Sequence, residues 1–163
     1  RSKQTSEIYP CHSVYHVTPE LYAKADPWFN ILFTMAKKKP SIRVKSYGIY
    51  HHWDSKSRDV PKVKEFTTEV PAEIGIEFGY VLELKGARGM KIEFCIDHPP
   101  FPGDDGKEAP PFLGELYVRT TPFLFYLGDT IWAPAENKVG PWRLTTRLDG
   151  ELVADRTFQI LST

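Results

Sequence analysis

The sequence contains little of what usually marks a specialised class of protein. Its 163 residues include only two cysteines, and 21 Lys and Arg are matched by 21 Asp and Glu. Domains dedicated to nucleic acid are usually basic overall, so this balance argues against that class. The chain has no apolar run near the ~20 residues that a membrane-spanning helix needs. It also has no phosphate-binding glycine loop, paired CxxC motif or G-x-S-x-G pattern.

Proline and aromatic residues are, by contrast, abundant. The chain has 14 Pro, 10 Phe, 8 Tyr and 4 Trp, and 41% of its residues are hydrophobic. Proline interrupts helices and fits the turns between short strands. A composition this rich in aromatics is not that of an intrinsically disordered chain. We therefore expect a Pro-rich domain built mostly of β-strands.

The N-terminal part differs from the rest, and we expect an extension over 1–40 and a β-sandwich domain over 41–163. The first methionine, Met35, precedes a Lys-rich stretch typical of a bacterial start, so 1–34 is not native under one interpretation. Under the other, Asp26-Pro27 begins a short buried helix. A Cys11–Cys95 disulfide is available only in the second case. So few cysteines favour the cytoplasm.

Alternating apolar residues predict strands at 76–84 and 90–96, each with one wet face. The five residues between them, Lys85 to Gly89, include two glycines. We expect an antiparallel hairpin in which Leu84 faces Met90 and Phe78 faces Ile96.

A second hairpin is expected from 142–148 and 152–160. Its apolar pattern requires either a three-residue loop or a bulge, with Trp142 opposite Phe158 and Leu148 opposite Leu152. Arg156 then shares the inner face, at the rim of the core. Further strands are predicted at 42–51, 63–69, 113–119 and 122–127. About seven short strands fit an antiparallel β-sandwich.

Two stretches together resemble an uncharacterised bacterial domain-of-unknown-function family. Residues 70–79 (VPAEIGIEFG) are similar to its IPA-x-x-G-x-x-FG signature. The tail, with Gly140-Pro141-Trp142 and then 152–160 (LVADRTFQI), is similar to its closing G-x-W and L-A-x-x-x-F-x-V strands. The likeness covers about 44–161. It implies an immunoglobulin-like β-sandwich and supplies no catalytic residues, because the matched positions are turn glycines, a proline and core aromatics.

A metal site is one candidate chemistry. Two strand ends carry His and Asp side chains that zinc accepts as ligands, namely His51, His52, Asp54, Asp97 and His98. If these ends meet, one of the two adjacent histidines would join the site, since neighbours on a strand point to opposite faces. The alternative is that all are solvent-exposed turn residues. The spacing matches no established metal motif, and no cofactor is expected.

Two surfaces are candidates for contact with a partner. The run 121–132 is too continuously apolar for a half-wet strand, so it is either buried in the monomer or presents Phe123, Phe125, Tyr126 and Trp132 to a partner or a second copy. The second surface carries Lys45, Tyr50 and His52.

Charge is distributed unevenly along the chain. Residues 37–64 contain nine basic and two acidic residues, against nine basic and sixteen acidic in 65–163. The basic stretch has two interpretations, weak nucleic-acid binding or lysines that protect an edge strand, and the balanced overall charge favours the second. The sequence thus favours a cytoplasmic, non-catalytic interaction or scaffold module, with homodimerisation open. The alternatives are a metal-binding protein or metal-dependent hydrolase and, more weakly, a nucleic-acid binder.

Overall fold

The computed structural model describes residues 39–54, 57, 59–103 and 106–163. They form strands and one short 3-10 helix: β1 (Ser41–Tyr50), β2 (Val63–Glu65), β3 (Glu69–Pro71), β4 (Glu77–Lys85), β5 (Lys91–Asp97), β6 (Phe112–Tyr117), β7 (Phe123–Thr130), η1 (Ala135–Lys138), β8 (Gly140–Leu148) and β9 (Glu151–Leu161). The predicted N-terminal helix and Cys11 lie outside the described residues.

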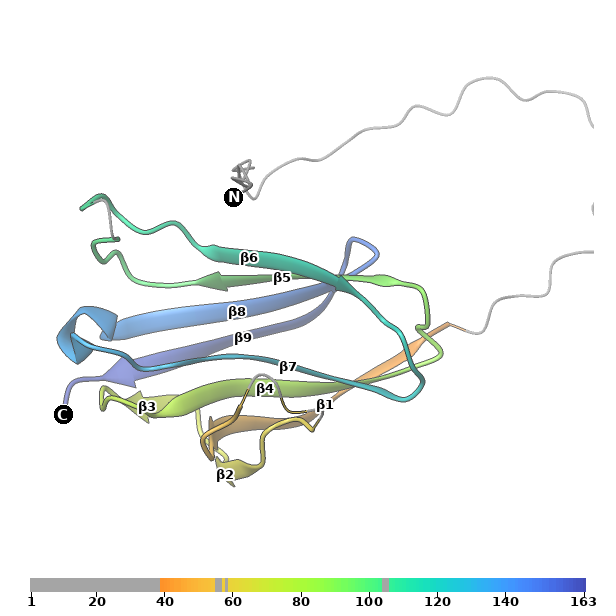
Figure 1. Ribbon diagram of the computed structural model, residues 1–163, viewed down its shortest axis with the longest axis horizontal. Coiled ribbons are helices and arrows are strands. Elements are labelled where there is room, and N and C mark those ends of the chain that lie inside the picture. Colours follow the sequence, from red (N-terminus) through yellow and green to blue (C-terminus); the bar gives the residue numbers. More distant parts are fainter. Residues whose placement is uncertain (1–38, 55–56, 58, 104–105) are drawn as a thin grey trace, which may run out of the picture. The chain divides into compact units, whose positions relative to one another are not determined.

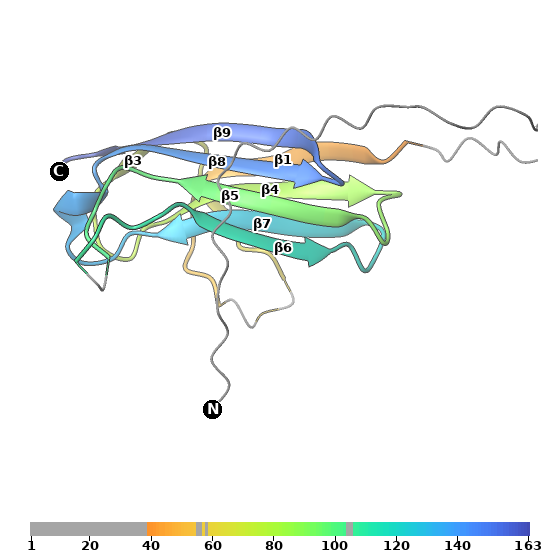
Figure 2. The same cartoon turned by 90° about the horizontal axis from the view of Figure 1, so that it is seen from above.

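The strands form two stacked sheets, as predicted for a β-sandwich (Figures 1 and 2). Sheet A has the order β2-β1-β4-β7, and sheet B has the order β3-β9-β8-β5-β6. All pairs are antiparallel except β3 with β9, which run parallel. Of the described helices, none is long and apolar enough to cross a membrane.

The core lies between the sheets and is dominated by aromatic rings. Phe78 of β4 makes edge-to-face contacts with Trp142 and Phe158 of sheet B, with ring centroids 5.6 and 5.5 Å apart. A polar bridge between the sheets joins the Tyr80 hydroxyl to Thr146 Oγ1 at 2.7 Å, which satisfies both buried groups. Burial, the main cause, raises the pKa of Tyr80 well above its usual value.

The predicted hairpin between 76–84 and 90–96 is wrong. β4 pairs with β1 and β7 in sheet A, whereas β5 pairs with β6 and β8 in sheet B. Lys85 to Gly89 therefore forms an arch from one sheet to the other. The inward residues are nevertheless those predicted, because Leu84, Ile92 and Ile96 are all buried in the one core. An arch and a hairpin leave the same alternation in a sequence.

The C-terminal hairpin combines a tight turn with the predicted bulge. Trp142 lies opposite Phe158 as expected, and the register shifts between Thr146 and Arg147. Leu148 faces Glu151, not Leu152, because the loop is the two residues Asp149-Gly150. Both of these have positive φ (46° and 84°), the geometry of a turn that suits twisted strands.

Arg156 lies opposite Leu144 on the inner face, as the apolar pattern predicted. Its guanidinium carbon sits 3.8 Å from the centre of the Tyr47 ring, and the side chain is half-buried. This stacking offsets part of the cost of placing a charge at the edge of the core.

Strand β4 does not have the wet face expected for 76–84. Every residue from Glu77 to Leu84 is buried. At Val81 the outer face is covered by the connection from β1 to β2, where Val60 and the buried Pro61 line the same small cavity as Val81. Two hydrogen bonds fix this connection, from His51 N to Lys62 O (3.0 Å) and from Trp53 Nε1 to Asp59 O (2.7 Å).

Candidate functional site

The four apolar residues predicted as one partner surface do not lie on one surface. Phe125 points into the core, where it is 7% exposed and its ring lies 5.8 Å from that of Phe94. Trp132 packs edge-on against Trp142, with centroids 6.0 Å apart. Phe123, which shares the inner face with Phe125, is half-buried, and only Tyr126 of the four lies on the outer face of sheet A.

The second predicted surface meets the first at Tyr126. Tyr50 is buried, its hydroxyl lies 2.8 Å from Ser46 Oγ, and its ring makes an edge-to-face contact with Tyr126 at 5.2 Å. Lys45 and His52 are exposed. Tyr50 and Tyr126 therefore lie in one region, the outer face of sheet A, where Trp53 of the β1–β2 connection also packs against Tyr126.

The residues proposed as metal ligands remain apart. His51, His52 and Asp54 are exposed just after β1, and Asp97 is exposed at the end of β5. In the part of the chain that the structure describes, no group of three or more His, Cys, Asp or Glu is placed to hold a metal ion.

His98 has a different environment from the other histidines. Its Nδ1 lies 2.9 Å from Pro99 O and its Nε2 lies 3.1 Å from Pro110 O. Its ring stacks on Phe101 at 4.3 Å. This ring tethers the two ends of the β5–β6 connection to each other.

A group of hydrogen-bonded polar side chains lies beside the last residues of β7. A groove of about 390 Å³ opens there, here called the β7 groove. It is lined by Trp53, Glu77, Phe94, Ile96, Tyr126, Leu127, Gly128, Asp129 and Thr130. Since β7 is an outermost strand of sheet A, the groove follows a strand edge that is free of any other described strand, and residues of both sheets lie in its walls.

Glu77 is the buried acceptor of this group, at 5% exposure. Its Oε1 accepts a hydrogen bond from the Tyr126 hydroxyl (2.9 Å), and its Oε2 accepts one from Thr130 Oγ1 (2.8 Å). Burial, with the nearby Glu77 charge, raises the pKa of Tyr126, so this hydroxyl stays protonated and donating.

Glycines make room for this arrangement. Gly79 of β4 lies opposite Gly128 of β7, and a Cβ on Gly79 would come 2.2 Å from Leu127 O. A Cβ on Gly128 would meet the Tyr126 hydroxyl at 2.1 Å. Without side chains here, the strands approach closely and the Tyr126 ring folds back toward Glu77.

Asp129 lies on the inner face of β7, on the side of the groove formed by Phe94 and Ile96. Its Oδ1 accepts a hydrogen bond from Thr130 N at 2.7 Å. Burial raises the pKa of Asp129 to about 6, and the Glu77 charge adds to the rise, while His98 and Lys138 oppose it. The described residues offer this carboxylate no salt bridge.

Trp53, Glu77, Asp129 and Thr130 were missed by the sequence analysis. Glu77 was assigned to a solvent-facing side, and nothing in the sequence locates the connection that covers it. Asp129-Thr130 did offer a signal, because it is a polar pair inside the apolar run 121–132.

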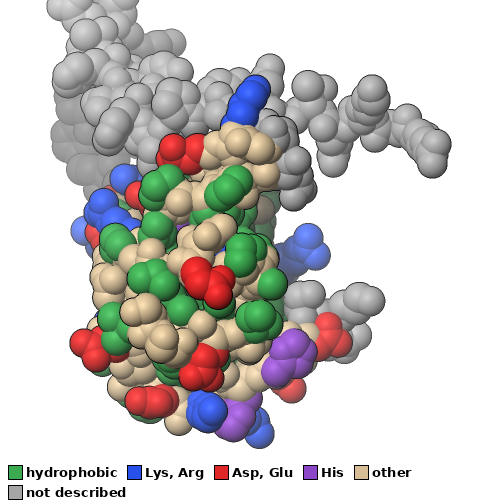
Figure 3. Space-filling view, turned by 90° about the vertical axis from the view of Figure 1, so that its left-hand side faces the viewer, with side chains coloured by type: hydrophobic (Ala, Val, Ile, Leu, Met, Phe, Trp, Pro, Cys, Tyr) green, Lys and Arg blue, Asp and Glu red, His purple; other side chains and the backbone are tan. Residues whose placement is uncertain are grey.

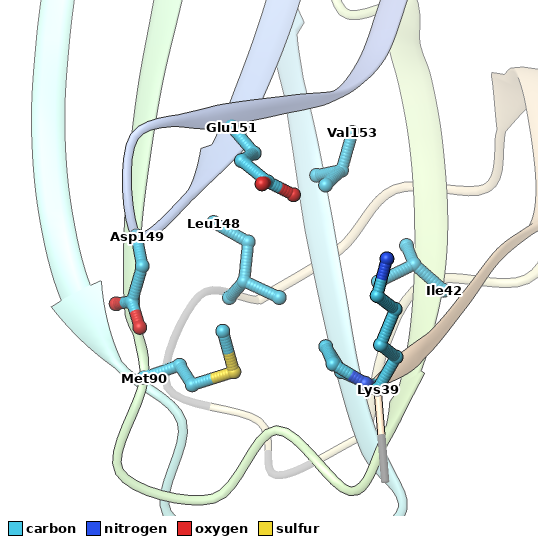
Figure 4. Close-up of a pocket in the computed structure, with 8 residues that line it drawn as sticks. Lys39, Ile42, Met90, Leu148, Asp149, Glu151 and Val153 are labelled. Atoms are coloured by element: carbon cyan, nitrogen blue, oxygen red, sulfur yellow. The ribbon is translucent and has the colours of Figure 1, made fainter. Parts of the chain in front are cut away.

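A second cavity, of about 320 Å³, lies at the opposite end of the strands (Figure 4). Ile42, Met90, Leu148 and Val153 supply apolar walls from both sheets. Figure 4 shows the Lys39 ammonium and the Glu151 carboxylate pointing into the same space. Mixed charges at the open end of a core are weaker evidence for a site than the ordered hydrogen bonds of the β7 groove.

Together the two sheets, the inter-sheet arch and the core define an immunoglobulin-like β-sandwich. A family model described as "Domain of unknown function (DUF3859)" matches residues 38–160. The chain belongs to this family, which confirms the predicted relationship. No curated protein matches the chain significantly.

Solved structures agree on the fold. An immunoglobulin-like protein from Pseudomonas aeruginosa matches with a TM-score of 0.61 and 24% identity, covering 77% of this chain and 99% of that one. The DNA glycosylase AlkC of Pseudomonas fluorescens, bound to DNA, matches with a TM-score of 0.36 and 11% identity, over 74% of this chain and 30% of that chain. The second likeness is too weak to support any functional argument.

Proposed function

We propose that this domain is a non-catalytic binding module that holds an extended segment of another polypeptide against the free edge of β7. The observation that carries the proposal is the β7 groove, which runs along an outermost strand and has walls on both sides of it. Strand addition to an open sheet edge is a common mode of peptide recognition.

The backbone of β7 supports this proposal. Ile131, which directly follows the strand, donates its N–H to Ile76 O on the β4 side at 2.8 Å. N–H directions alternate along a strand, so those of Leu124, Tyr126 and Gly128 point to the open edge. Asp129 already caps the Thr130 N–H at the end of this row. A partner strand would satisfy the remaining groups.

The walls of the groove suit alternating side chains. Trp53 and Tyr126 lie edge-to-face with centroids 5.2 Å apart and form the outer wall. Phe94 and Ile96 form the inner wall. Successive side chains of an added strand point to opposite faces, so one would contact the aromatic wall and the next the wall of sheet B.

The surface at the end of the domain where β7 finishes also has a composition that suits contact with another protein. On the end shown in Figure 3, hydrophobic and acidic side chains interleave, while Lys and Arg lie mainly at the margins. Arg43, part of the predicted basic stretch, is engaged with Glu83 at 2.8 Å. These features favour a polypeptide over nucleic acid as the partner.

The test blocks the edge without touching the groove. Leu124→Pro removes an edge N–H, and Pro is tolerated where that N–H faces outward. Leu124→Ala removes the same side chain and keeps the N–H. Both proteins, with the wild type, are used to select from random peptides of about ten residues, the upper length of ordinary strands.

Peptides selected by the wild type are expected to bind Leu124→Ala nearly as well and to bind Leu124→Pro about tenfold more weakly, since backbone hydrogen bonds supply much of the affinity. Selected peptides that bind both variants equally would contradict the proposal. A homodimer that is seen by sedimentation velocity and that Leu124→Pro dissociates would also contradict the proposal, because the edge of β7 would then bind a second copy of this chain. Stoichiometric zinc or calcium in the purified protein would favour the metal alternative instead.

A further inference from the structure

The β7 groove holds an ionisable group that the fold does not neutralise. Glu77 is hydrogen-bonded through both oxygens to the hydroxyls of Tyr126 and Thr130. Asp129, in contrast, uses Oδ1 for the Thr130 N–H, and no Lys or Arg of the described residues pairs with it. A carboxylate beside Phe94 and Ile96 without a cation is costly to keep ionised.

His98 and Lys138 are the basic side chains that oppose the rise in the pKa of Asp129, and both make their contacts outside the groove. Lys138 is 2% exposed, its Nζ lies 4.4 Å from the centres of both the Phe101 and Trp132 rings, and it donates to Pro134 O at 3.4 Å. His98 is held between two backbone carbonyls. Neither side chain is placed to fill the groove.

Retaining this carboxylate costs stability, because burial raises its pKa to about 6 and it is ionised above that pH. An amide would make the same hydrogen bond to Thr130 N without that cost. Costly ionisable groups that open on a cavity are typical of binding sites.

Resting on the proposed strand addition, we propose that the docked segment carries a Lys or Arg whose cationic end enters the β7 groove and pairs with Asp129. Glu77 adds negative potential to the groove, but Asp129 makes the direct contact with the cation, because both Glu77 oxygens already accept hydrogen bonds. The rings of Trp53 and Tyr126 would pack against the aliphatic stem of such a side chain or face its charge.

A second copy of this chain is a poorer occupant. Strand β7 reads FLFYLGDT and contains no Lys or Arg. Two copies paired edge to edge through β7 would therefore bring no Lys or Arg of the partner's β7 to Asp129. The groove therefore fits a different polypeptide with a basic side chain at one position.

The experiment repeats the random-peptide selection with wild type, Asp129→Asn and Leu124→Pro. Asparagine keeps an oxygen for the Thr130 N–H, and thermal unfolding verifies that the variant is folded. We expect wild-type binders to be enriched in Lys or Arg at one position, about tenfold over the input. The Asp129→Asn selection should lose this enrichment while still yielding binders that Leu124→Pro rejects.

Binding of a selected basic peptide should also depend on pH. Because the pKa of Asp129 is about 6, its carboxyl group is ionised in only about a tenth of the molecules near pH 5. The affinity for the basic peptide should therefore fall roughly tenfold from about pH 7.5 to about pH 5. The same peptide should show a much flatter profile with Asp129→Asn. Glu77, His98 and Lys138 remain in the variant, so the difference isolates Asp129.

The outcomes separate the two proposals. Edge-dependent binders with no basic preference, or a preference unchanged by Asp129→Asn, would overturn the role of Asp129 and leave strand addition intact. Binders that ignore Leu124→Pro would overturn both proposals.

Discussion

Strands β4 and β8 occupy interior positions of the two sheets, yet their outer faces differ completely. β8 alternates between buried and exposed residues, whereas β4 is buried at every position from Glu77 to Leu84. Both sequences alternate in a similar way. The difference comes from the β1–β2 connection, which covers β4, so the environment of a strand is decided here by a segment distant in sequence.

The largest expected effect on stability comes from the two outer-face glutamates of β4, Glu77 and Glu83, which test how well this face is shielded from water. Glu77→Ala should lower the free energy of unfolding by about 3 kcal/mol, because the half-buried hydroxyls of Tyr126 and Thr130 both lose the carboxylate acceptor, and only that of Tyr126 keeps another one, Phe78 O at 3.0 Å. Glu83→Ala should cost much less, since Arg43 and Lys85 bind Glu83 from exposed positions. Urea denaturation measures both.

Repeating these measurements at high ionic strength provides the control for the Glu77 and Glu83 variants. The Glu83 contribution should shrink at high ionic strength, because exposed ion pairs are screened. The Glu77 contribution should not change. Equal losses for the two variants would mean that the covering connection does not exclude water from the outer face of β4.

Asp129→Asn is expected to stabilise the protein near neutral pH by about 2 kcal/mol. The folded pKa of about 6 lies above 3.8, the ordinary pKa of an Asp side chain, so between these values the folded state holds a proton that the unfolded state has lost. Wild-type stability from this group should therefore fall as the pH rises from about 4 to about 6 and then stay level. Unfolding curves across this range should show that fall in the wild type but not in the variant. A wild type that gains stability across the same interval, relative to Asp129→Asn, would refute the raised pKa.

The outer faces of the two interior strands can be compared by mirrored isosteric changes. Val81→Thr on β4 should cost about 1.5 kcal/mol, because Val81 is 1% exposed and a hydroxyl would be buried there. Thr145→Val on β8 should change stability by less than about 0.5 kcal/mol, since this residue is half-buried on an open face. Similar effects at both sites would contradict the difference between the two faces.

The smallest effect concerns the charge on the inner face of sheet B. Arg156→Gln should cost about 0.5 kcal/mol through loss of its stacking on Tyr47. Arg156→Lys should retain part of this contribution, and Tyr47→Leu should make the two variants equally stable. A double-mutant cycle by chemical denaturation measures the coupling.

The difference between β4 and β8 also explains which features of the fold could be predicted from the sequence. Period-two alternation correctly identified the inward residues and the fold class, because burial in one core is a property of each strand by itself. Pairing was not predictable for β4 and β5, since an inter-sheet arch and a hairpin bury the same residues. The bulge in the β8–β9 hairpin was predictable because the apolar patterns on both sides of a short turn had to match.

The candidate site was harder to predict than the fold. Glu77 and Tyr126 are 49 positions apart, and they meet only because β4 and β7 are neighbours in sheet A. The outer wall of the groove depends on Trp53, from a connection without regular structure. Tyr126 was predicted as a contact residue, and Asp129-Thr130, a polar pair in an apolar run, offered a signal that the sequence analysis did not use.

The arch between β4 and β5 also has a consequence for the order of assembly in time. Neither strand can pair with its immediate successor. β4 can pair with β1 as soon as it is synthesised, but its other edge must await β7, which begins at Phe123, almost 40 residues after β4 ends at Lys85. The Asp149-Gly150 hairpin, in contrast, closes locally and would form in about 1–10 microseconds. A nascent chain would thus leave one edge of β4, a strand buried at every position from Glu77 to Leu84 in the folded domain, unpaired until β7 has been synthesised, and an unpaired strand edge of this kind is prone to aggregation.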